Sequence, residues 1–250
     1  MDYREAGVTA RHPASAADLS VKIFADGADV DGIRALCSNA QIAGFTTNPT
    51  LMRKAGVSDY EVFAREVLEF VSDRPISFEV FSDDTSEMRR QALKIASWAD
   101  NVYVKIPVTN TRGESMAPLA HDLSESGVKV NVTALFTTAQ VEVITDAVKD
   151  GAPSNISVFA GRIADAGVDP LPMMSASLEI MSAAPRSELI WASPREILNI
   201  VQADDIGCHI ITVTHDLLAK LGSIGKDLSR FSLETVEMFH NDAASAGFVL

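Results

Sequence analysis

Short apolar runs, rich in β-branched residues, recur along the chain from residue 21 onward. Most are continuous rather than alternating, which is typical of strands that are covered on both faces in a parallel sheet. The pattern predicts eight strands, at Val21–Asp26, Gly44–Thr47, Ile76–Phe81, Val102–Pro107, Lys129–Leu135, Asn155–Phe159, Glu188–Ala192 and His209–Val213.

Segments with a helical period lie between these runs. Ser58–Ser72 has one apolar and one charged face, as an amphipathic helix does. Thr85–Ala99 follows Asp84, and Glu87 stands three residues after that aspartate, which is the spacing of a capping box. Further helices are predicted at Thr138–Lys149, Met173–Ala184, Pro194–Gln202, Thr214–Leu221 and, after the last strand, Ser232–Ala246.

This alternation predicts the α/β fold class, as a single (β/α)8 TIM barrel with an extra C-terminal helix, over residues 21–250. Residues 1–20 are polar and Ala-rich without a clear period, and we interpret them as an N-terminal extension. The alternative architecture is a doubly wound open sheet. It would need a glycine-rich turn after the first strand to hold a nucleotide, and Phe24–Asp29 has none.

Composition narrows the classes of partner. The chain has 250 residues and is 47% hydrophobic, which excludes intrinsic disorder. The 34 acidic residues against 21 Lys and Arg give a net charge of -13, and the absence of a basic run argues against nucleic acid. An anionic substrate would need a locally cationic pocket. No segment approaches the roughly 20 apolar residues of a membrane span, so we expect no membrane association.

Cysteine and histidine usage points to a reducing compartment and no metal site. Cys37 and Cys208 lack metal-ligand spacing, and two thiols in a chain of this length indicate a cytoplasmic protein. The first 20 residues contain no apolar stretch typical of a secretory signal. The histidines form no H-x-x-x-H cluster of the kind that binds a metal. They are His12, His121, His209, His215 and His240.

Polar residues occupy the C-terminal ends of nearly all the predicted strands, where TIM-barrel enzymes carry their active sites. One polar residue at a rim is commonly a satisfied surface group. A whole set is harder to explain in that way, because buried polar atoms without function cost stability. The set comprises Asp26, Asn48, Glu79, Lys105, Asn131, Thr133, Ser157, Arg162 and Ser193.

Lys105 is the most informative of these residues, because Val104 and Ile106 flank it on a predicted central strand. Burial disfavours an ammonium and can lower the pKa of a lysine by up to about 3–5 units. A neutral amine can attack a carbonyl group and form a Schiff base. The alternative is a structural ion pair with Asp26 or Glu79.

Six segments at successive strand ends resemble the transaldolases and their small-subunit relatives, which include fructose-6-phosphate aldolase. Each segment is modest alone, but their order along the chain is highly specific. They cover nearly the whole chain, from residue 21 to about 240. They are Phe24–Asp26, Thr46–Leu51, Val104–Pro107, Asn131–Phe136, Ser157–Ile163 and Ala192–Ser193.

The resemblance implies a Schiff-base enzyme, without metal or other cofactor, that moves dihydroxyacetone from a ketose phosphate to an aldose phosphate. It implies that Lys105 forms the Schiff base and that Asp26 handles the sugar hydroxyl proton. Glu79 and Thr133 resemble the pair that activates the catalytic water. The implied substrate-binding residues are Asn48, Asn131 and Ser157 at the dihydroxyacetone hydroxyls, with Arg162 and Ser193 at the phosphate.

Two positions favour a transaldolase over a fructose-6-phosphate aldolase. Glu79 stands where those aldolases have glutamine. Phe159, which we place at the substrate site, stands where they have a tyrosine whose hydroxyl could assist release of free dihydroxyacetone. Two alternatives stay open. The first is a fructose-6-phosphate-type aldolase or a specialised aldol transferase acting on an unusual biosynthetic sugar. The second is a non-catalytic sugar-phosphate-binding barrel.

The seventh strand departs from the transaldolase pattern Ala-Ser-Phe-Arg. Here Ser193 is followed by Pro194 and Arg195, and a predicted helix begins directly. Arg195 is therefore either the second phosphate-binding arginine or an ordinary residue of the first helical turn.

The C-terminal segment Leu233–His240 is amphipathic, and an apolar tail follows it at Ala246–Leu250. Such a tail can cover the barrel's own mouth or a neighbouring subunit. In the small relatives this helix packs on the next subunit of a ring. The resemblance thus implies a homo-oligomer, of five or ten chains.

Overall fold

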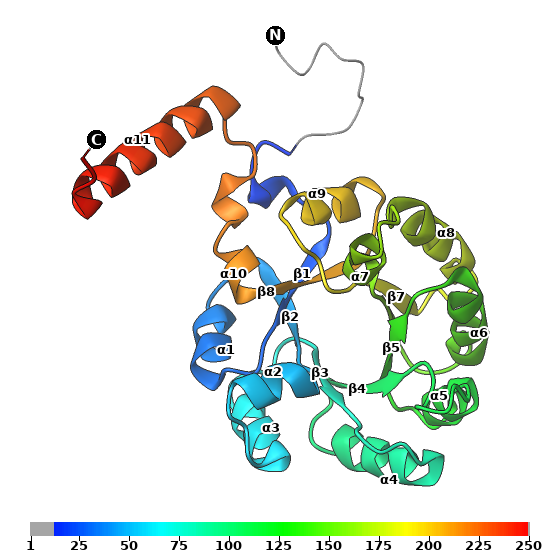
Figure 1. Ribbon diagram of the computed structural model, residues 1–250. Coiled ribbons are helices and arrows are strands. Elements are labelled where there is room, and N and C mark those ends of the chain that lie inside the picture. The colour runs from blue at the N-terminus through cyan, green and yellow to red at the C-terminus, as the bar shows by residue number, and fades with distance from the viewer. Residues whose placement is uncertain (1–12, 250) are drawn as a thin grey trace.

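The computed structural model describes residues 13–249, so predictions about residues 1–12 and Leu250 lie outside the described residues. Eight parallel strands close into a barrel in their sequence order, and helices surround it (Figure 1). The predicted TIM barrel with an additional C-terminal helix is confirmed, and the doubly wound open sheet is wrong.

The strands lie where the apolar runs predict them, with ends displaced by two residues at most. The register pairs Glu79 with Lys105 and Lys105 with Asn131, so these residues of three adjacent strands lie side by side. The strands are β1 (Lys22–Asp26), β2 (Ile42–Thr46), β3 (Ile76–Glu79), β4 (Val102–Pro107), β5 (Val130–Leu135), β6 (Ser154–Val158), β7 (Ser187–Trp191) and β8 (Ile210–Thr214).

All the predicted helices are present, and the α-helices of residues 13–249 include four that were not predicted, α1, α2, α5 and α7. The predicted Asp84 cap forms, since its carboxylate accepts the Glu87 amide at 2.9 Å. The helices are α1 (Val30–Cys37), α2 (Pro49–Lys54), α3 (Tyr60–Leu68), α4 (Thr85–Ala96), α5 (Ala117–Glu125), α6 (Thr138–Val148), α7 (Ala160–Asp165), α8 (Leu171–Met181), α9 (Leu198–Asp205), α10 (His215–Leu218) and α11 (Leu228–Ala246).

Apolar side chains pack in two separate clusters. The larger one lies between the strands and the surrounding helices and includes the fully buried Phe45 and Phe78. A smaller cluster of Phe24, Ile190, Ala192 and Ile210 lies inside the barrel. Because side chains alternate along a strand, Phe24 shares the inner face of β1 with Asp26. The inner cluster therefore forms an apolar base beneath the polar strand ends.

Helix α11 projects away from the barrel (Figure 1). None of its residues is buried, although it carries large apolar side chains that a lone helix would leave in water. The exposed ones are Leu228, Phe231, Leu233, Val236, Met238 and Phe239. Between residues 13 and 249, no helix is both long enough and apolar enough to cross a membrane.

Candidate active site

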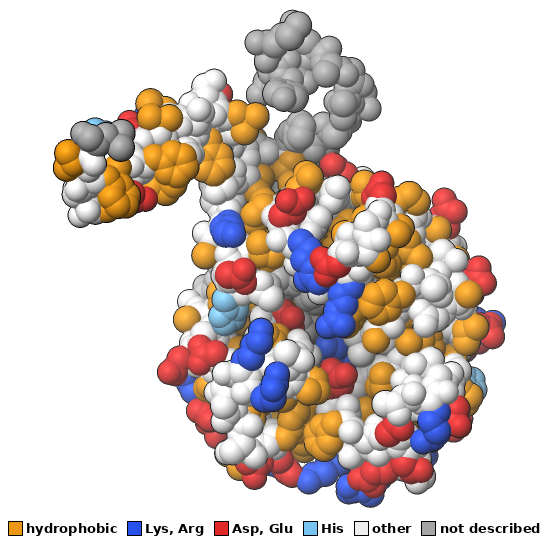
Figure 2. Space-filling view, in the orientation of Figure 1, with side chains coloured by type: hydrophobic (Ala, Val, Ile, Leu, Met, Phe, Trp, Pro, Cys, Tyr) orange, Lys and Arg blue, Asp and Glu red, His pale blue; other side chains and the backbone are white. Residues whose placement is uncertain are grey.

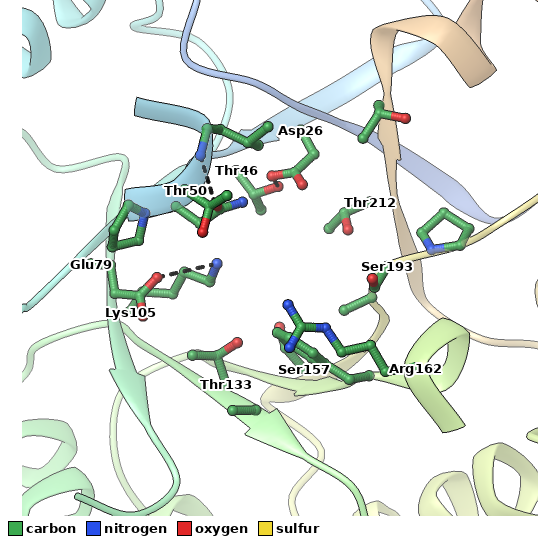
Figure 3. Close-up of a pocket in the computed structure, with 18 of the residues that line it drawn as sticks. Asp26, Thr46, Thr50, Glu79, Lys105, Thr133, Ser157, Arg162, Ser193 and Thr212 are labelled. Atoms are coloured by element: carbon green, nitrogen blue, oxygen red, sulfur yellow. Dashed lines mark hydrogen bonds and ion pairs between the residues drawn. The ribbon is translucent and has the colours of Figure 1, made fainter. Parts of the chain in front are cut away.

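A cavity of about 480 Å³ opens at the carboxyl ends of the barrel strands (Figure 3). All the predicted site residues line it except Asn131. Those that line it are Asp26, Asn48, Glu79, Lys105, Thr133, Ser157, Phe159, Arg162, Ser193 and Arg195. Residues from β1, β3, β4, β5 and β6 therefore converge on one space, as the TIM-barrel argument predicts.

Lys105 extends from β4 into this cavity and is only 7% exposed. Its ammonium donates a hydrogen bond to the Thr47 carbonyl at 3.0 Å. It also lies 3.6 Å from Glu79 Oε2 (Figure 3). The ion pair with Glu79 is the contact that the structural alternative requires. It also places an acid–base group beside an amine that faces a cavity, so the geometry serves Schiff-base chemistry equally well.

Asp26 and Glu79 are two buried carboxyl groups with different partners. Thr46 Oγ1 donates to Asp26 at 2.8 Å, whereas Glu79 faces Lys105. Burial raises the pKa of Asp26, although the charge of Lys105 and the Thr46 hydrogen bond oppose the shift. Burial likewise raises the pKa of Glu79, and Lys105 again opposes it. A raised carboxyl pKa suits proton transfer near neutral pH.

Thr133 lines the cavity from β5. Its hydroxyl is buried, and it has no hydrogen-bond partner among the described residues. The next residue, Ala134, has a left-handed φ of 63°, and the pairing of β5 with β6 shifts register between Val132 and Leu135. The hydroxyl is thus held at the cavity wall with its hydrogen-bonding capacity available to a water or a substrate oxygen.

Asn131 is fully buried and does not line the cavity. Its amide nitrogen donates to Ser77 Oγ at 3.0 Å, and its amide oxygen accepts the Ser157 hydroxyl at 2.7 Å. The register places it beside Lys105. Asn131 therefore orients Ser157, which does line the cavity. The side-chain oxygen of Asn48, at the cavity wall, caps α2 by accepting the Leu51 amide at 3.0 Å.

The cavity wall carries four cations, Lys54, Lys105, Arg162 and Arg195, against two carboxylates. This cationic excess contrasts with the net charge of -13. Figure 2 shows basic side chains around the hollow at the middle of this face. The site therefore has the local positive charge that an anionic substrate requires.

The two arginines differ in their availability. The Arg162 guanidinium stacks over the Phe159 ring at 5.1 Å and makes no hydrogen bond or ion pair with a described residue. Arg195 is ion-paired with Asp165, which its Nε approaches to 2.9 Å, and its Nη1 donates to Ser193 Oγ at 3.0 Å. Arg195 precedes α9, which begins at Leu198. The prediction of a helix from Pro194 is wrong at its start, and so is the first-turn interpretation of Arg195.

Close backbone packing places Arg162 beside β7. A Cβ atom on Gly161 would lie 1.5 Å from the Ser193 carbonyl oxygen, so only glycine allows α7 to approach at this point. The Gly161 amide also donates to the Ala192 carbonyl at 3.3 Å. Ser193 itself has a left-handed φ of 63°. The Ala-Gly-Arg segment and the Ala-Ser segment thus form one corner of the cavity.

Comparison with known proteins agrees with this geometry. The family model described as Transaldolase/Fructose-6-phosphate aldolase matches residues 23–249. The chain belongs to this family. A relative named "Probable transaldolase" from Streptococcus equi subsp. zooepidemicus is 39% identical over 202 residues, which are 80% of this chain and 90% of that protein. A protein of the same name from Streptococcus pyogenes serotype M5 is 38% identical over the same shares.

The family resemblance expected from the sequence is therefore confirmed, and the protein is a transaldolase-family enzyme. This match opposes the alternative of a barrel that binds sugars without catalysis.

The sequence analysis did not predict several of the residues that line the cavity. Thr212 lies on β8 within the run Ile210–Val213, and a polar residue in an apolar run was the available signal. Lys54, at the end of α2, had no such signal, because an exposed lysine on a helix is ordinary. The remaining polar residues of the wall are Thr46, Thr50 and Thr214.

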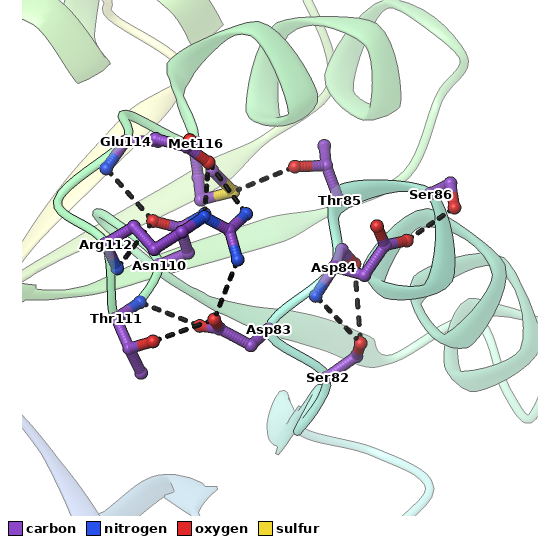
Figure 4. A network of polar contacts seen from close by, with 10 residues as sticks. All are labelled: Ser82, Asp83, Asp84, Thr85, Ser86, Asn110, Thr111, Arg112, Glu114 and Met116. Atoms are coloured by element: carbon purple, nitrogen blue, oxygen red, sulfur yellow. Dashed lines mark hydrogen bonds and ion pairs between the residues drawn. The ribbon is translucent and has the colours of Figure 1, made fainter.

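The loop after Lys105 is ordered by polar contacts with the loop after β3 (Figure 4). Asp83 accepts the Thr111 amide and hydroxyl, both at 2.7 Å, and Arg112 contacts both Asp83 and Glu114. Gly113 has a φ of 78° and does not line the cavity, so it shapes the turn. These contacts join the loops that follow the two strands bearing Glu79 and Lys105.

Proposed function

We propose that the protein is a transaldolase, which transfers a dihydroxyacetone unit from a ketose phosphate to an aldose phosphate through a Schiff base on Lys105. The observation that carries this proposal is the position of Lys105. It is a buried amine that faces a cation-rich cavity, with Glu79 3.6 Å away. A group placed only to stabilise the barrel would not need to face that cavity.

The residues divide the proton transfers between them. Lys105 in its neutral form attacks the ketose carbonyl, water leaves, and a protonated imine forms. Glu79, with a water held at the Thr133 hydroxyl, supplies and removes the protons of this step. Asp26 takes the proton of the hydroxyl on the carbon beyond the bond that breaks. The electron pair of that bond passes to the iminium and gives an enamine and a free aldehyde.

The second half of the reaction reverses these steps on a new aldehyde. The enamine carbon attacks the acceptor carbonyl, and the new alkoxide takes back the proton that Asp26 holds. Water then hydrolyses the imine and releases Lys105. Ser157 and Asn48 face the cavity near Lys105, where the dihydroxyacetone hydroxyls would bind, and Arg162 provides a planar fork for the phosphate.

An aldolase that releases free dihydroxyacetone is the second candidate. Phe159 disfavours it, because its ring packs between Phe136, at 5.7 Å, and Arg162, and offers no hydroxyl for the proton transfer to the enamine. An unusual biosynthetic sugar as donor or acceptor fits the same residues. Borohydride trapping with other ketoses tests this possibility.

We also propose that the protein is a cytoplasmic homo-oligomer of five or ten chains in which α11 covers a neighbouring subunit. The exposed apolar side chains of α11, including Phe231 and Phe239, support an interface there. Cys37 and Cys208 form no disulfide with each other. Light scattering of the purified chain would give the subunit number, and a monomer at micromolar concentration would contradict the proposal.

Borohydride trapping tests the catalytic proposal directly. The protein is incubated with fructose 6-phosphate and reduced, and the added mass is located by peptide mapping. An adduct of dihydroxyacetone size on Lys105, absent in Lys105→Met, would support the proposal. A folded protein with no adduct from fructose 6-phosphate or from a panel of other ketoses would refute it.

A further inference from the structure

Tyr60 on α3 joins the outside of the barrel to Glu79. Its hydroxyl donates to the Glu79 carbonyl at 2.8 Å and accepts the Glu79 amide at 2.7 Å. One phenol group thus satisfies both main-chain polar groups of a single residue. A hydroxyl can do this because it has one donor and two acceptor lone pairs.

The register of the sheet shows which hydrogen bond this hydroxyl replaces. The Phe45 amide donates to the Pro75 carbonyl at 2.9 Å, and the Thr47 amide donates to the Ser77 carbonyl at 3.3 Å. In a parallel ladder the next bond in this series would run from the Glu79 amide to the Thr47 carbonyl. That bond is not made, because the chain leaves β2 here and enters α2 at Pro49.

The Thr47 carbonyl is instead occupied by Lys105, whose ammonium donates to it at 3.0 Å. The hydrogen bond expected between the Glu79 amide and the Thr47 carbonyl is therefore replaced by two others. Lys105 takes the acceptor that the ladder would give to Glu79, and Tyr60 provides the replacement for Glu79. Both reacting groups of the proposed mechanism depend on this exchange.

Three aromatic neighbours hold the Tyr60 ring. It packs edge-on against Phe78 and Phe81, with centroids at 6.3 and 5.1 Å, and lies 5.9 Å from Trp98. Asp59 caps α3 by accepting the Val62 amide at 3.0 Å, which sets where the helix and its first residue, Tyr60, begin. Burial raises the pKa of Tyr60 far above its ordinary value, so the hydroxyl remains a donor.

We propose that Tyr60 is a positioning residue for catalysis: it holds the end of β3 so that the Glu79 carboxylate meets Lys105 and its substrate adduct in the productive geometry. This inference rests on the proposed function, since it assigns Tyr60 a role through Glu79. Without the hydroxyl, the Glu79 amide and carbonyl lose their partners, and the last residue of a four-residue strand is free to shift. Small misplacements of a catalytic group cost large factors in rate.

The test is a double-mutant cycle with Tyr60→Phe and Glu79→Gln. In the otherwise unchanged enzyme, Tyr60→Phe should lower kcat by about 10-fold and leave KM within about 2-fold, because the donor contacts are untouched. In the Glu79→Gln background the same change should alter kcat by less than about 2-fold, because the group that Tyr60 positions is already disabled.

Tyr103→Phe is the matched control. Tyr103 lies on β4, two residues before Lys105, and its hydroxyl makes no hydrogen bond with a described residue. The Tyr103→Phe variant also loses one phenol oxygen, from β4 beside β3, and it should leave kcat unchanged. Thermal unfolding of each variant separates rate effects from loss of fold.

The outcomes are distinct. Loss of kcat in the Tyr60→Phe enzyme alone, with no further loss in the Glu79→Gln background, supports the positioning role. An unchanged kcat in folded Tyr60→Phe, or an equal loss in both backgrounds, overturns it and leaves only a structural role. Wild-type protein is trapped with borohydride first. If wild type gives no Lys105 adduct, the proposed function fails, which is distinguishable from failure of the Tyr60 inference alone.

Discussion

Replacing Arg162 by alanine tests whether the free arginine of the cavity is the phosphate-binding group. Its guanidinium makes no hydrogen bond or ion pair with a described residue, so all its donors are available to a ligand. A hydrogen bond to a charged group contributes about 1.5–3 kcal/mol. Since about 1.4 kcal/mol is tenfold in affinity, loss of Arg162 should weaken binding of a phosphorylated donor by roughly 10- to 150-fold.

Arg195→Ala is the matched control in the same cavity. The Asp165 carboxylate already occupies Nε of Arg195 and contacts its Nη2, and Ser193 occupies Nη1. A phosphate would have to compete for these donors, so the loss on removing Arg195 should be less than about 10-fold, below that of Arg162. A larger loss of donor binding in Arg162→Ala than in Arg195→Ala would indicate that the free guanidinium binds the phosphate.

The assay is the donor concentration that gives half-maximal borohydride trapping on Lys105, which requires no acceptor. It is measured for fructose 6-phosphate and for fructose. Arg162→Ala should weaken only the phosphorylated donor. Equal weakening for both donors, or a larger effect of Arg195→Ala than of Arg162→Ala, would refute the assignment of the free guanidinium to the phosphate.

Three further predictions concern the carboxylate and the backbone. Glu79→Gln should slow turnover by about 10²-fold or more, as expected for a lost general acid–base; turnover at the wild-type rate would contradict its role. Burial raises the pKa of Glu79 above that of a glutamate in the unfolded chain. At pH values between the two pKa values, the folded protein therefore binds more protons than the unfolded chain. The free energy of unfolding consequently falls as the pH rises through this interval. Glu79→Gln should remove this loss. Denaturant unfolding should therefore show the variant gaining stability relative to wild type from pH 4 to pH 7. A difference in unfolding free energy that stays constant over this range would contradict the effect of burial on Glu79. Ala134 has a φ of 63°, a conformation that costs an L-residue roughly 1–2 kcal/mol, so Ala134→Gly should leave the melting temperature unchanged or raise it. The control is Ala35→Gly in the exposed part of α1, where φ is helical, and it should lower stability by about 1 kcal/mol.

The strands could be predicted because strands covered on both faces must be continuous apolar runs, and each run is bounded by polar residues. Helices α2 and α7 were missed because six residues are too few to show an amphipathic period. Helix α9 was placed four residues early, because the segment before it is held by Asn199, whose side-chain oxygen accepts the Arg195 amide at 2.8 Å.

A residue of the candidate site could be predicted where a charged or polar side chain stands among apolar neighbours in the sequence. Lys105 between two apolar neighbours is such a case, and its position in the cavity follows from the strand alone. Asn131 was expected at the dihydroxyacetone hydroxyls; it is buried with its amide bonded to Ser77 and Ser157, contacts with other strands that its own strand did not reveal. Tyr60 gave no signal, because its contact with Glu79 spans 19 residues and depends on how α3 packs against β3.

The cationic cavity in an acidic protein has opposite consequences for the two phases of ligand binding. At physiological ionic strength charges are screened over about 8 Å, so an approaching sugar phosphate meets first the repulsion of a surface with a net charge of -13. Added salt weakens that repulsion and speeds encounter. Inside, the same salt competes with the phosphate for Arg162 and shortens the residence time. Association and dissociation rates should therefore both rise with salt, and the affinity should pass through a maximum at an intermediate ionic strength.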